Sequence, residues 1–271
     1  FALANDEDPE IRAQFARLAN DLLGDIRKGF SNTDIPDEHL TQLASTVEAQ
    51  LRDKSQRVQS FAALALGKLG RASSLPAVVK FVETNNNEDP VLRHAGVMAL
   101  TGIAEQQGID QVLKHSAHAS SAVRIAVLLT ARRLNDGHVA DFLSDRDPQI
   151  VAEASRAIND TPIKAGLDAL ARLATAPKRL NDDAVIRRVL NANLRLGKTA
   201  NLKAVAEVAA NAGLDETIRV EALTLIAAWN EPPPLDRVNG RWWPIDKRTL
   251  DGISEMVAPY LTGLWSDSDA I

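Results

Sequence analysis

The feature that most constrains this chain is a recurring pair, an apolar residue followed by a basic one, that opens segments rich in Ala and Leu. The good copies are Ile11-Arg12, Leu92-Arg93, Val123-Arg124, Ile186-Arg187 and Ile218-Arg219, and the degenerate copies are Val58-Gln59 and Ile150-Val151. Successive copies are 47, 34, 31, 27, 36 and 32 residues apart. Periods of this length are typical of solenoids whose unit is a pair of helices. The spacing therefore predicts an all-α chain, an α-α superhelix of about seven helical-hairpin repeats.

The apolar pattern inside each repeat is helical. Offset +8 from the first motif residue is apolar in every copy: Ala19, Leu66, Leu100, Ala131, Ile158, Leu194 and Ile226. Offsets 0, +4, +7, +8 and +11 share one face of a helix with 3.6 residues per turn. We therefore expect this face to be buried between neighbouring helices.

Capping residues mark the ends of these segments. Asp-Pro pairs stand shortly before three copies of the motif, as Asp8-Pro9, Asp89-Pro90 and Asp147-Pro148, and Asp183 and Asp215 hold similar places without proline. Asp accepts hydrogen bonds from the free amides at a helix start, and Pro fits the first helical position. Gly24, Gly70 and Gly197 are expected to end their helices as C-terminal caps.

These signals give the expected elements. First helices of the repeats are predicted near 9–23, 56–69, 90–106, 120–134, 148–159, 183–196 and 216–229. Partner helices are predicted near 37–51, 74–84, 109–117, 138–144, 163–175 and 199–211, and residues 29–36 are predicted to form a surface loop. The solenoid then spans 1–229, and 230–271 form a Pro- and Trp-containing strap with a capping helix near 247–263.

The C-terminal segment differs in composition from the repeats. Three consecutive prolines, Pro232 to Pro234, exclude a continuous helix there, and all four Trp lie at or after Trp229. Because Trp and Arg are enriched at binding hot spots, Arg237, Arg241, Trp242 and Trp243 form a possible docking surface. The interpretation that we favour from the sequence is that the Trp pair caps exposed core, and docking against a neighbouring domain is the alternative.

Charge and composition limit the function. The net charge of −5, from 31 basic and 36 acidic residues, argues against a general nucleic-acid surface. No apolar run approaches the roughly 20 residues that cross a bilayer. With no cysteine, this segment has no disulfide, thiolate metal site or covalently attached haem, and we expect no cofactor in it. Because the chain begins at Phe1 inside apparent structure, we expect a piece of a longer protein.

The motif resembles the HEAT family, in the bacterial form where a helix opens with Asp, a short gap and Val-Arg. The resemblance covers residues 5–229 and implies a HEAT/armadillo-like solenoid that binds proteins. It also implies a structural ladder of ion pairs and hydrogen bonds between repeats, made by Asp8, Arg12, Asp89, Arg93, Arg124, Asp183, Arg187, Asp215 and Arg219. Gln59 and Val151 depart from the pattern, so we expect the ladder to be interrupted there.

Four longer strings carry a narrower resemblance. They are Leu92 to Ala95 (LRHA), Glu153 to Ile163 (EASRAINDTPI), Arg187 to Asn193 (RRVLNAN) and Leu235 to Gly240 (LDRVNG). Together they look like the HEAT region of large bacterial proteins that join a glucose/sorbosone-dehydrogenase-like propeller to HEAT repeats and a c-type cytochrome domain. The resemblance implies a periplasmic redox protein in which this chain is the spacer between the two, or a dock for another subunit.

No set of residues indicates catalysis. His115 and His118 stand three apart and could share a helix face as metal ligands do, but solvated or turn histidines explain them as well. No nucleophile, phosphate-loop or dinucleotide motif is present, so we assign no catalytic residue and no metal ligand. Asn191 and Asn193 are different, because Asn193 falls at a core offset. A buried amide needs hydrogen-bond partners, so we predict a buried polar clamp onto a neighbouring loop.

Three hypotheses follow. The first is a noncatalytic HEAT scaffold within a multidomain periplasmic redox protein, and the second is an independent regulatory protein-binding domain. The third is a HEAT-fold enzyme acting on nucleic acid or a pigment, which needs a basic, aromatic-lined groove.

Overall fold

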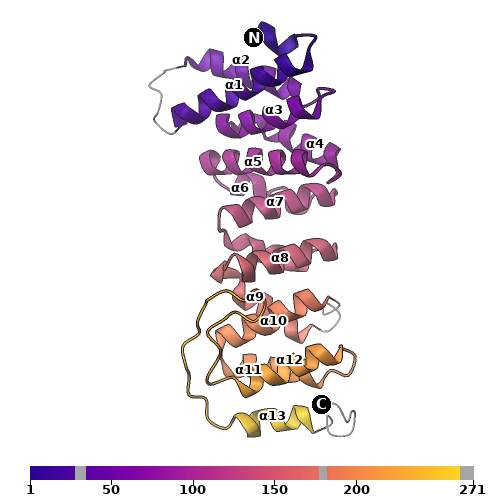
Figure 1. Cartoon of the computed structure of the whole chain (residues 1–271), viewed down its shortest axis with the longest axis vertical. Helices are drawn as coiled ribbons and strands as arrows, with labels where there is room; N and C mark the ends of the chain where they lie inside the picture. Colours follow the sequence, from indigo (N-terminus) through magenta and orange to yellow (C-terminus); the bar gives the residue numbers. More distant parts are fainter. Residues whose placement is uncertain (28–34, 177–181, 263–271) are drawn as a thin grey trace. The chain divides into compact units, whose positions relative to one another are not determined.

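The computed structural model describes residues 1–27, 35–176 and 182–262, and in these residues every regular element is a helix (Figure 1). The first helices of the repeats, called A helices below, are α1 (Pro9–Arg27), α3 (Gln56–Leu69), α5 (Pro90–Gln107), α7 (Ser121–Arg133), α8 (Pro148–Asp160), α10 (Asp183–Leu196) and α12 (Glu216–Ala227). The second elements, called B elements, are α2 (Asp37–Gln50), α4 (Leu75–Asn85), α6 (Asp110–Leu113), η3 (Gly137–Ser144), α9 (Leu167–Arg172), α11 (Thr199–Ala210) and α13 (Ile253–Leu261). Short 3₁₀ helices complete the set: η1 (Ala2–Asn5), η2 (Ala72–Ser74), η4 (Lys164–Gly166) and η5 (Leu173–Thr175).

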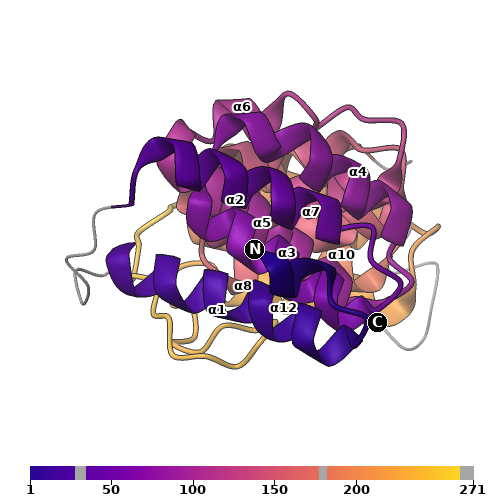
Figure 2. The same cartoon turned by 90° about the horizontal axis from the view of Figure 1, so that it is seen from above.

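The chain divides into two compact units, Phe1–Asn135 and Asp136–Ile271. In the first unit α1 packs along α3, α3 along α5 and α5 along α7, so the A helices form a continuous layer. The end-on view in Figure 2 shows α2, α4 and α6 on the side of this unit away from α1. In the second unit α8 packs on α10 and α10 on α12, while α11 packs against α10 and α12 from the other layer.

Side-chain caps explain where the A helices begin. The Asp89 carboxylate accepts hydrogen bonds from the amides of Val91 and Leu92, and Asp147 accepts one from Gln149. The α10 cap differs from the prediction. Asp182 is the N-cap and accepts from the Val185 amide, whereas Asp183 is the first helical residue.

Two of the three predicted glycine caps end their helices. Gly70 after α3 and Gly197 after α10 both have positive φ, at 62° and 67°, which glycine adopts without a Cβ penalty. The prediction for Gly24 was wrong, because α1 continues to Arg27 and Gly24 lies inside it. The predicted loop at 29–36 falls mostly in residues 28–34, which lie outside the described part of the chain.

The B elements differ most from the prediction. Residues 137–144 form the 3₁₀ helix η3 instead of an α-helix, α6 has only four residues, and α9 is flanked by the 3₁₀ turns η4 and η5. A 3₁₀ helix rises about 2.0 Å per residue against 1.5 Å for an α-helix, so it spans the same distance with fewer residues. The 3₁₀ form of η3 therefore lets the shortest repeat, of 27 residues, connect α7 to α8 with fewer residues than an α-helix would need.

Glycines let the A helices of the first unit approach closely. A Cβ built on Gly67 of α3 would lie 2.9 Å from both the Ala99 Cα and the Met98 carbonyl oxygen of α5, and a Cβ on Gly102 would overlap the Gly67 carbonyl group. Such distances are too short for real side-chain carbons, so the α3–α5 crossing requires glycine at both positions.

The last repeat is closed by an unusual route. The polypeptide leaves α12, runs as an extended strap over residues 230–252 and only then forms α13, which packs on α11 (Figure 1). The final helix therefore begins at Ile253 instead of the predicted residue 247, and it takes the B position of the last repeat.

Candidate docking surface on the C-terminal strap

The first half of the strap folds into a small hairpin at residues 234–243. Its two arms are joined by backbone hydrogen bonds from the Asp236 amide to the Arg241 carbonyl, at 2.8 Å, and from the Trp243 amide to the Pro234 carbonyl, at 3.1 Å. Leu235 and Trp242 form an antiparallel bridge between the arms. Gly240, at φ 70°, supplies the left-handed residue that closes the turn.

Asp236 shapes the turn and anchors it. Its Oδ1 accepts the amides of Val238 and Asn239 at 2.9 and 3.0 Å, which is an Asx turn. Its Oδ2 accepts Asn191 Nδ2 at 2.8 Å and Arg195 Nη2 at 2.7 Å, both from α10. The carboxylate side chain is fully buried in this nest of donors. Burial alone would raise the pKa of Asp236, but the hydrogen bonds from Arg195, Asn239, Asn191 and Val238 outweigh it and hold the pKa below its ordinary value.

Arg195 links the hairpin to α10 a second time. Its guanidinium carbon lies 3.3 Å from the centroid of the Trp243 ring, and its Nη1 donates to the Trp243 carbonyl at 3.2 Å. Burial lowers the pKa of Arg195, and the Asp236 carboxylate partly restores it. The guanidinium remains charged at neutral pH because its ordinary pKa is far above 7, so the ion pair and the cation–π contact both persist.

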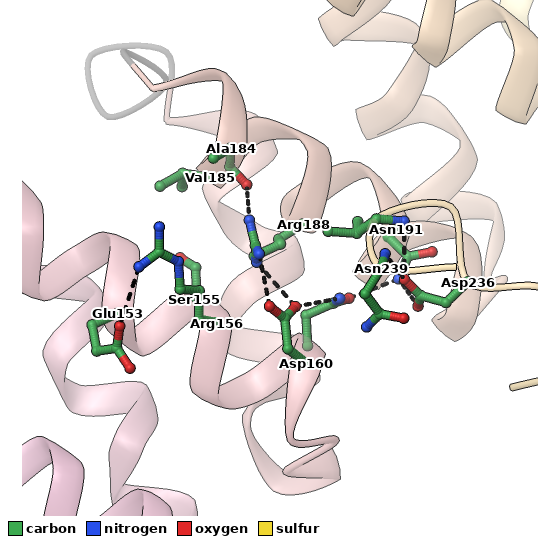
Figure 3. Close-up of polar contacts among 12 residues, drawn as sticks. Glu153, Ser155, Arg156, Asp160, Ala184, Val185, Arg188, Asn191, Asp236 and Asn239 are labelled. Carbon is green, nitrogen blue, oxygen red and sulfur yellow. Dashed lines mark hydrogen bonds and ion pairs between the residues drawn. The ribbon is translucent and has the colours of Figure 1, made fainter. Parts of the chain in front are cut away.

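The same network continues to the C-terminal end of α8. Asn191 Nδ2 also donates to Asn159 Oδ1 at 2.7 Å, and Asn159 donates to the neighbouring Asp160 carboxylate. Arg188 binds Asp160 with two hydrogen bonds of 3.1 and 2.7 Å (Figure 3). From the strap, Arg241 donates to the Asp160 carbonyl at 3.1 Å. A continuous polar path thus ties α8, α10 and the strap hairpin together.

The hairpin turns one face inward and the other outward. Successive residues of an extended arm point to opposite sides. Asp236 and Trp243 therefore face α10, while their neighbours Leu235 and Trp242 face solvent with 50% and 72% of their surface exposed. The result is a turn that is anchored to α10 on one side and presents a paired leucine and tryptophan on the other.

The structure separates the four predicted docking residues. Trp243 folds back onto Arg195, and Arg237 is held by Glu221 of α12 through two hydrogen bonds of 2.6 and 2.7 Å. Arg241 is exposed, although one of its nitrogens reaches the Asp160 carbonyl. Trp242 is the one member whose ring is largely uncovered, and its exposed neighbour is Leu235, which the sequence did not single out.

Asn193 belongs to a second buried contact, on another side of α10. Its Nδ2 donates to the Ala171 carbonyl at the end of α9 and to the Val189 carbonyl, and its Oδ1 accepts from Asn201 of α11. Asn191 and Asn193 are both buried. The two amides thus hold different segments, Asn191 the strap and Asn193 the neighbouring α9 and α11.

The motif residues at offset +1 mainly hold the loop before their own helix. Arg12 donates to the Asp6 and Glu7 carbonyls, and Arg124 donates to the His118 and Ala119 carbonyls. Arg219 donates to the Ala209 carbonyl at 3.1 Å. The Arg12 and Arg124 contacts hold the loop before the helix, and the Arg219 contact joins α12 to the end of α11.

Among the predicted ladder residues in the described chain, Arg12 forms an ion pair that crosses to the next repeat. Arg12 Nε and Nη2 bind the two carboxylate oxygens of Asp53, in the loop before α3, at 2.6 and 2.9 Å. Side-chain hydrogen bonding to Arg12 lowers the pKa of Asp53. Asp53 stands five residues before its motif, a position that the sequence interpretation overlooked. The sequence signal that could have indicated this contact is an Asp two residues before Ser55, the N-cap residue of α3.

The remaining ladder residues make simpler contacts. Asp8 and Asp215 accept the amides of Glu10 and Thr217 as helix caps. The hydrogen bonds from the Thr217 hydroxyl and amide lower the pKa of Asp215, and the charge of Arg187 adds to this. The Arg93 side chain makes no hydrogen bond or ion pair with the other described residues.

The expected interruption at Gln59 is not seen. Its amide donates to the Asp53 carbonyl at 2.6 Å, replacing the arginine contact. A neutral donor suffices because the acceptor is a backbone carbonyl.

His115 and His118 lie in the turns after α6, with ring centroids 6.3 Å apart. Burial is the main cause that lowers the pKa of His115, and the nearby His118 lowers it further. Among the described residues no three potential metal ligands come together, and no described helix is long and apolar enough to span a bilayer. An open cavity of about 760 Å³ in the first unit has an apolar floor of Leu51, Phe81 and Leu92, and its rim carries charges of both signs.

Residues 43–129 match the family model of HEAT repeats. This match falls within the first unit and agrees with its stacked helical hairpins, so the fold class is an all-α HEAT-type solenoid. A crystal structure of an engineered protein from the Northeast Structural Genomics Consortium is similar over 99% of this chain and 74% of its own, at 16% identity and a TM-score of 0.43. No curated protein sequence matches the chain.

Proposed function

We propose that this chain is a noncatalytic HEAT-type scaffold that binds protein through the outward face of its strap hairpin. The observation that carries the proposal is the Leu235–Trp242 pair, held outward by a turn whose inner side is fixed to α10. A pre-ordered tryptophan suits a hot spot, because little side-chain and backbone entropy is lost on binding. The HEAT match supports a role in protein binding.

We further propose that the chain is the spacer between a dehydrogenase-like propeller and a c-type cytochrome domain in a larger periplasmic redox protein. The support is the resemblance of the four strings. Three of them supply the network beneath the strap: Asn159 and Asp160 come from the second string, Arg188 and Asn191 from the third, and Asp236 from the fourth. A segment built to orient the strap is what a spacer with a fixed docking face requires.

A binding measurement tests the docking proposal. The probe is a c-type cytochrome domain, which the spacer proposal below places downstream in the same gene, titrated against the wild-type chain and the Trp242→Ala variant. We expect the substitution to raise Kd at least about tenfold, as loss of a hot spot of roughly 2 kcal/mol does. Val91→Ala is the matched control, since Val91 is an exposed apolar residue of the first unit. Equal Kd values for wild type and Trp242→Ala would contradict the proposal.

The gene itself tests the spacer proposal separately. Extending the reading frame upstream should reveal a secretion signal and a propeller, and extending it downstream should reveal a Cys-x-x-Cys-His haem motif. A reading frame that encodes these 271 residues without either flanking domain would leave the regulatory protein-binding alternative in place of the spacer.

A further inference from the structure

The turn of the strap hairpin contains the one Asn-Gly pair of the sequence, Asn239-Gly240. Such a pair can deamidate without an enzyme, because the amide nitrogen of the second residue attacks the side-chain carbonyl carbon of the first. Glycine favours this attack, since it has no Cβ to hinder the approach and its backbone is the least restricted. Asn239 is half-buried and Gly240 is exposed, so water reaches the turn. The pair is therefore a candidate site of covalent modification.

The side-chain amide of Asn239 is placed to react. Its Oδ1 accepts a hydrogen bond from the Arg241 amide at 2.9 Å. That donor would stabilise the negative charge that develops on Oδ1 when the carbonyl carbon is attacked. The Nδ2 atom, which leaves as ammonia, is bound by no acceptor among the described residues. The electrophile is thus polarised and its leaving group is free.

The nucleophile, in contrast, is held back by Asp236. The Gly240 amide donates to the Asp236 carbonyl at 2.8 Å, whereas the attack requires this nitrogen to lose its proton. The Asp236 side chain keeps its own carbonyl in place, because Oδ1 accepts the Val238 and Asn239 amides and Oδ2 is bound to α10 (Figure 3). The network that anchors the strap therefore also blocks the reaction.

We infer that Asn239 is a deamidation site that opens only when the strap leaves α10. In the released strap the Gly240 nitrogen gives up its proton and bonds to Asn239 Cγ. The Cγ–Nδ2 bond breaks, and ammonia departs with that proton. Water then opens the cyclic imide, at the side-chain carbonyl to give aspartate or at the main-chain carbonyl to give isoaspartate. The net change consumes one water and releases one ammonia.

Isoaspartate at position 239 cannot rebuild the turn. The main chain gains a methylene before Gly240, so the Gly240 amide no longer meets the Asp236 carbonyl in the same register. The oxygen that accepts the Arg241 amide becomes part of the main chain. One opening of the strap is thereby made permanent. Only the effect on partner binding rests on the proposed function, because the covalent change involves this chain and water alone.

Peptide mapping by mass spectrometry tests the inference by following the loss of Asn239 during incubation at mildly alkaline pH. The native wild type should convert at least about a hundredfold more slowly than the same chain unfolded in guanidinium chloride, because the anchored turn must first open. This comparison needs no variant, so it holds even where a substitution disturbs folding.

Two variants of α10 show whether the strap controls the site. Asn191→Ala, which loosens the strap, should convert at least about tenfold faster than the wild type. Asn193→Ala is the matched control, because Asn193 is similarly buried on the same helix but does not touch the strap, and it should convert as the wild type does. Circular dichroism verifies that both variants fold. Limited proteolysis should then cut residues 230–252 faster in the isoaspartate form than in the unmodified chain.

Four outcomes would overturn the inference. One is a native wild type that converts as fast as the unfolded chain, and another is Asn191→Ala converting no faster than the wild type. A third is Asn193→Ala matching Asn191→Ala, which would mean that lost stability and not release of the strap opens the site. The fourth is equal proteolysis of the isoaspartate and unmodified forms. No binding partner enters these measurements, so their failure is distinct from failure of the docking proposal.

Discussion

The two units join their A helices by different means. In the first unit α3 and α5 meet through Gly67 and Gly102 with backbone against backbone. In the second unit α8 and α10 meet through Asn159 and Asn191, and Asn191 also reaches the strap. Close packing of apolar atoms fixes the distance between two helices, but it does not depend on which apolar groups meet. A buried polar network is satisfied only in one arrangement, so it can fix the register of a segment such as the strap.

The largest effect is expected from Asp236→Ala. The substitution leaves the Arg195 guanidinium buried without its carboxylate, which costs about 3–5 kcal/mol of unfolding free energy in comparable pairs. Urea denaturation measures the loss, and limited proteolysis should show new cleavage in residues 230–252. Arg237→Ala, which breaks the exposed pair with Glu221, should cost less than about 1 kcal/mol. Similar losses for both variants would mean that the strap is not anchored by the network.

Gly102→Val should have the next largest effect and should act on the other joint. The added carbons collide with the Gly67 carbonyl group, so α3 and α5 must separate, at a cost of about 1–3 kcal/mol or more. The control is Gly24→Ala, because a Cβ at Gly24 would meet only the Lys68 side chain at 3.8 Å. That change should stabilise α1 by up to about 1 kcal/mol through helix propensity. Thermal unfolding of both variants would show whether the first unit depends on glycine contact.

Asn193→Ala should cost about 1–3 kcal/mol, because it takes a partner from the buried Ala171 carbonyl and from the half-buried Asn201 amide. The strap should stay in place in this variant, since Asn193 does not touch it. Unfolding experiments give the loss, and an unchanged proteolysis pattern at the strap separates this clamp from the Asp236 network.

The smallest expected effect is an acid-dependent one. The folded-state pKa of Asp236 is depressed, so its contribution to stability is complete above its unfolded pKa near 3.8 and is lost as pH falls through the lower folded pKa. The wild type should therefore lose stability more steeply below pH 3.8 than Asp236→Asn does. Urea midpoints measured across the acid range compare the two, and parallel curves would show that the carboxylate is not specially stabilised.

The sequence predicted the A helices closely because their signals are local. The α3 and α10 bounds match the predicted 56–69 and 183–196, since the motif, a cap residue and Gly70 or Gly197 all lie within the segment. The B elements were predicted less well because α6 and η3 are too short to show a helical period. The conformation of α6 and η3 depends on the distance between the two A helices that each one connects, which the local sequence does not show.

The strap network was only partly predictable. Asn193 was recognisable as an amide at a core offset, and Asn191 was predicted to share its buried polar clamp. Their partners were not, because Asp236 lies 45 residues from Asn191 and Arg241 lies 81 residues from Asp160. The Asp-Arg-Val-Asn-Gly sequence at 236–240 was a local signal for a turn, which the sequence analysis did not use. Nothing local indicated that its second oxygen would bind α10.

Amide hydrogen exchange of the strap tests the central claim most directly. The claim is that the buried network holds the hairpin in one conformation and so presents Leu235 and Trp242. The amides of Asp236, Gly240 and Trp243 donate within the hairpin, so they should exchange slowly in the wild type and much faster in Asn191→Ala, while the α3 amides stay unchanged. Fast exchange of these three amides in the wild-type chain would contradict the account.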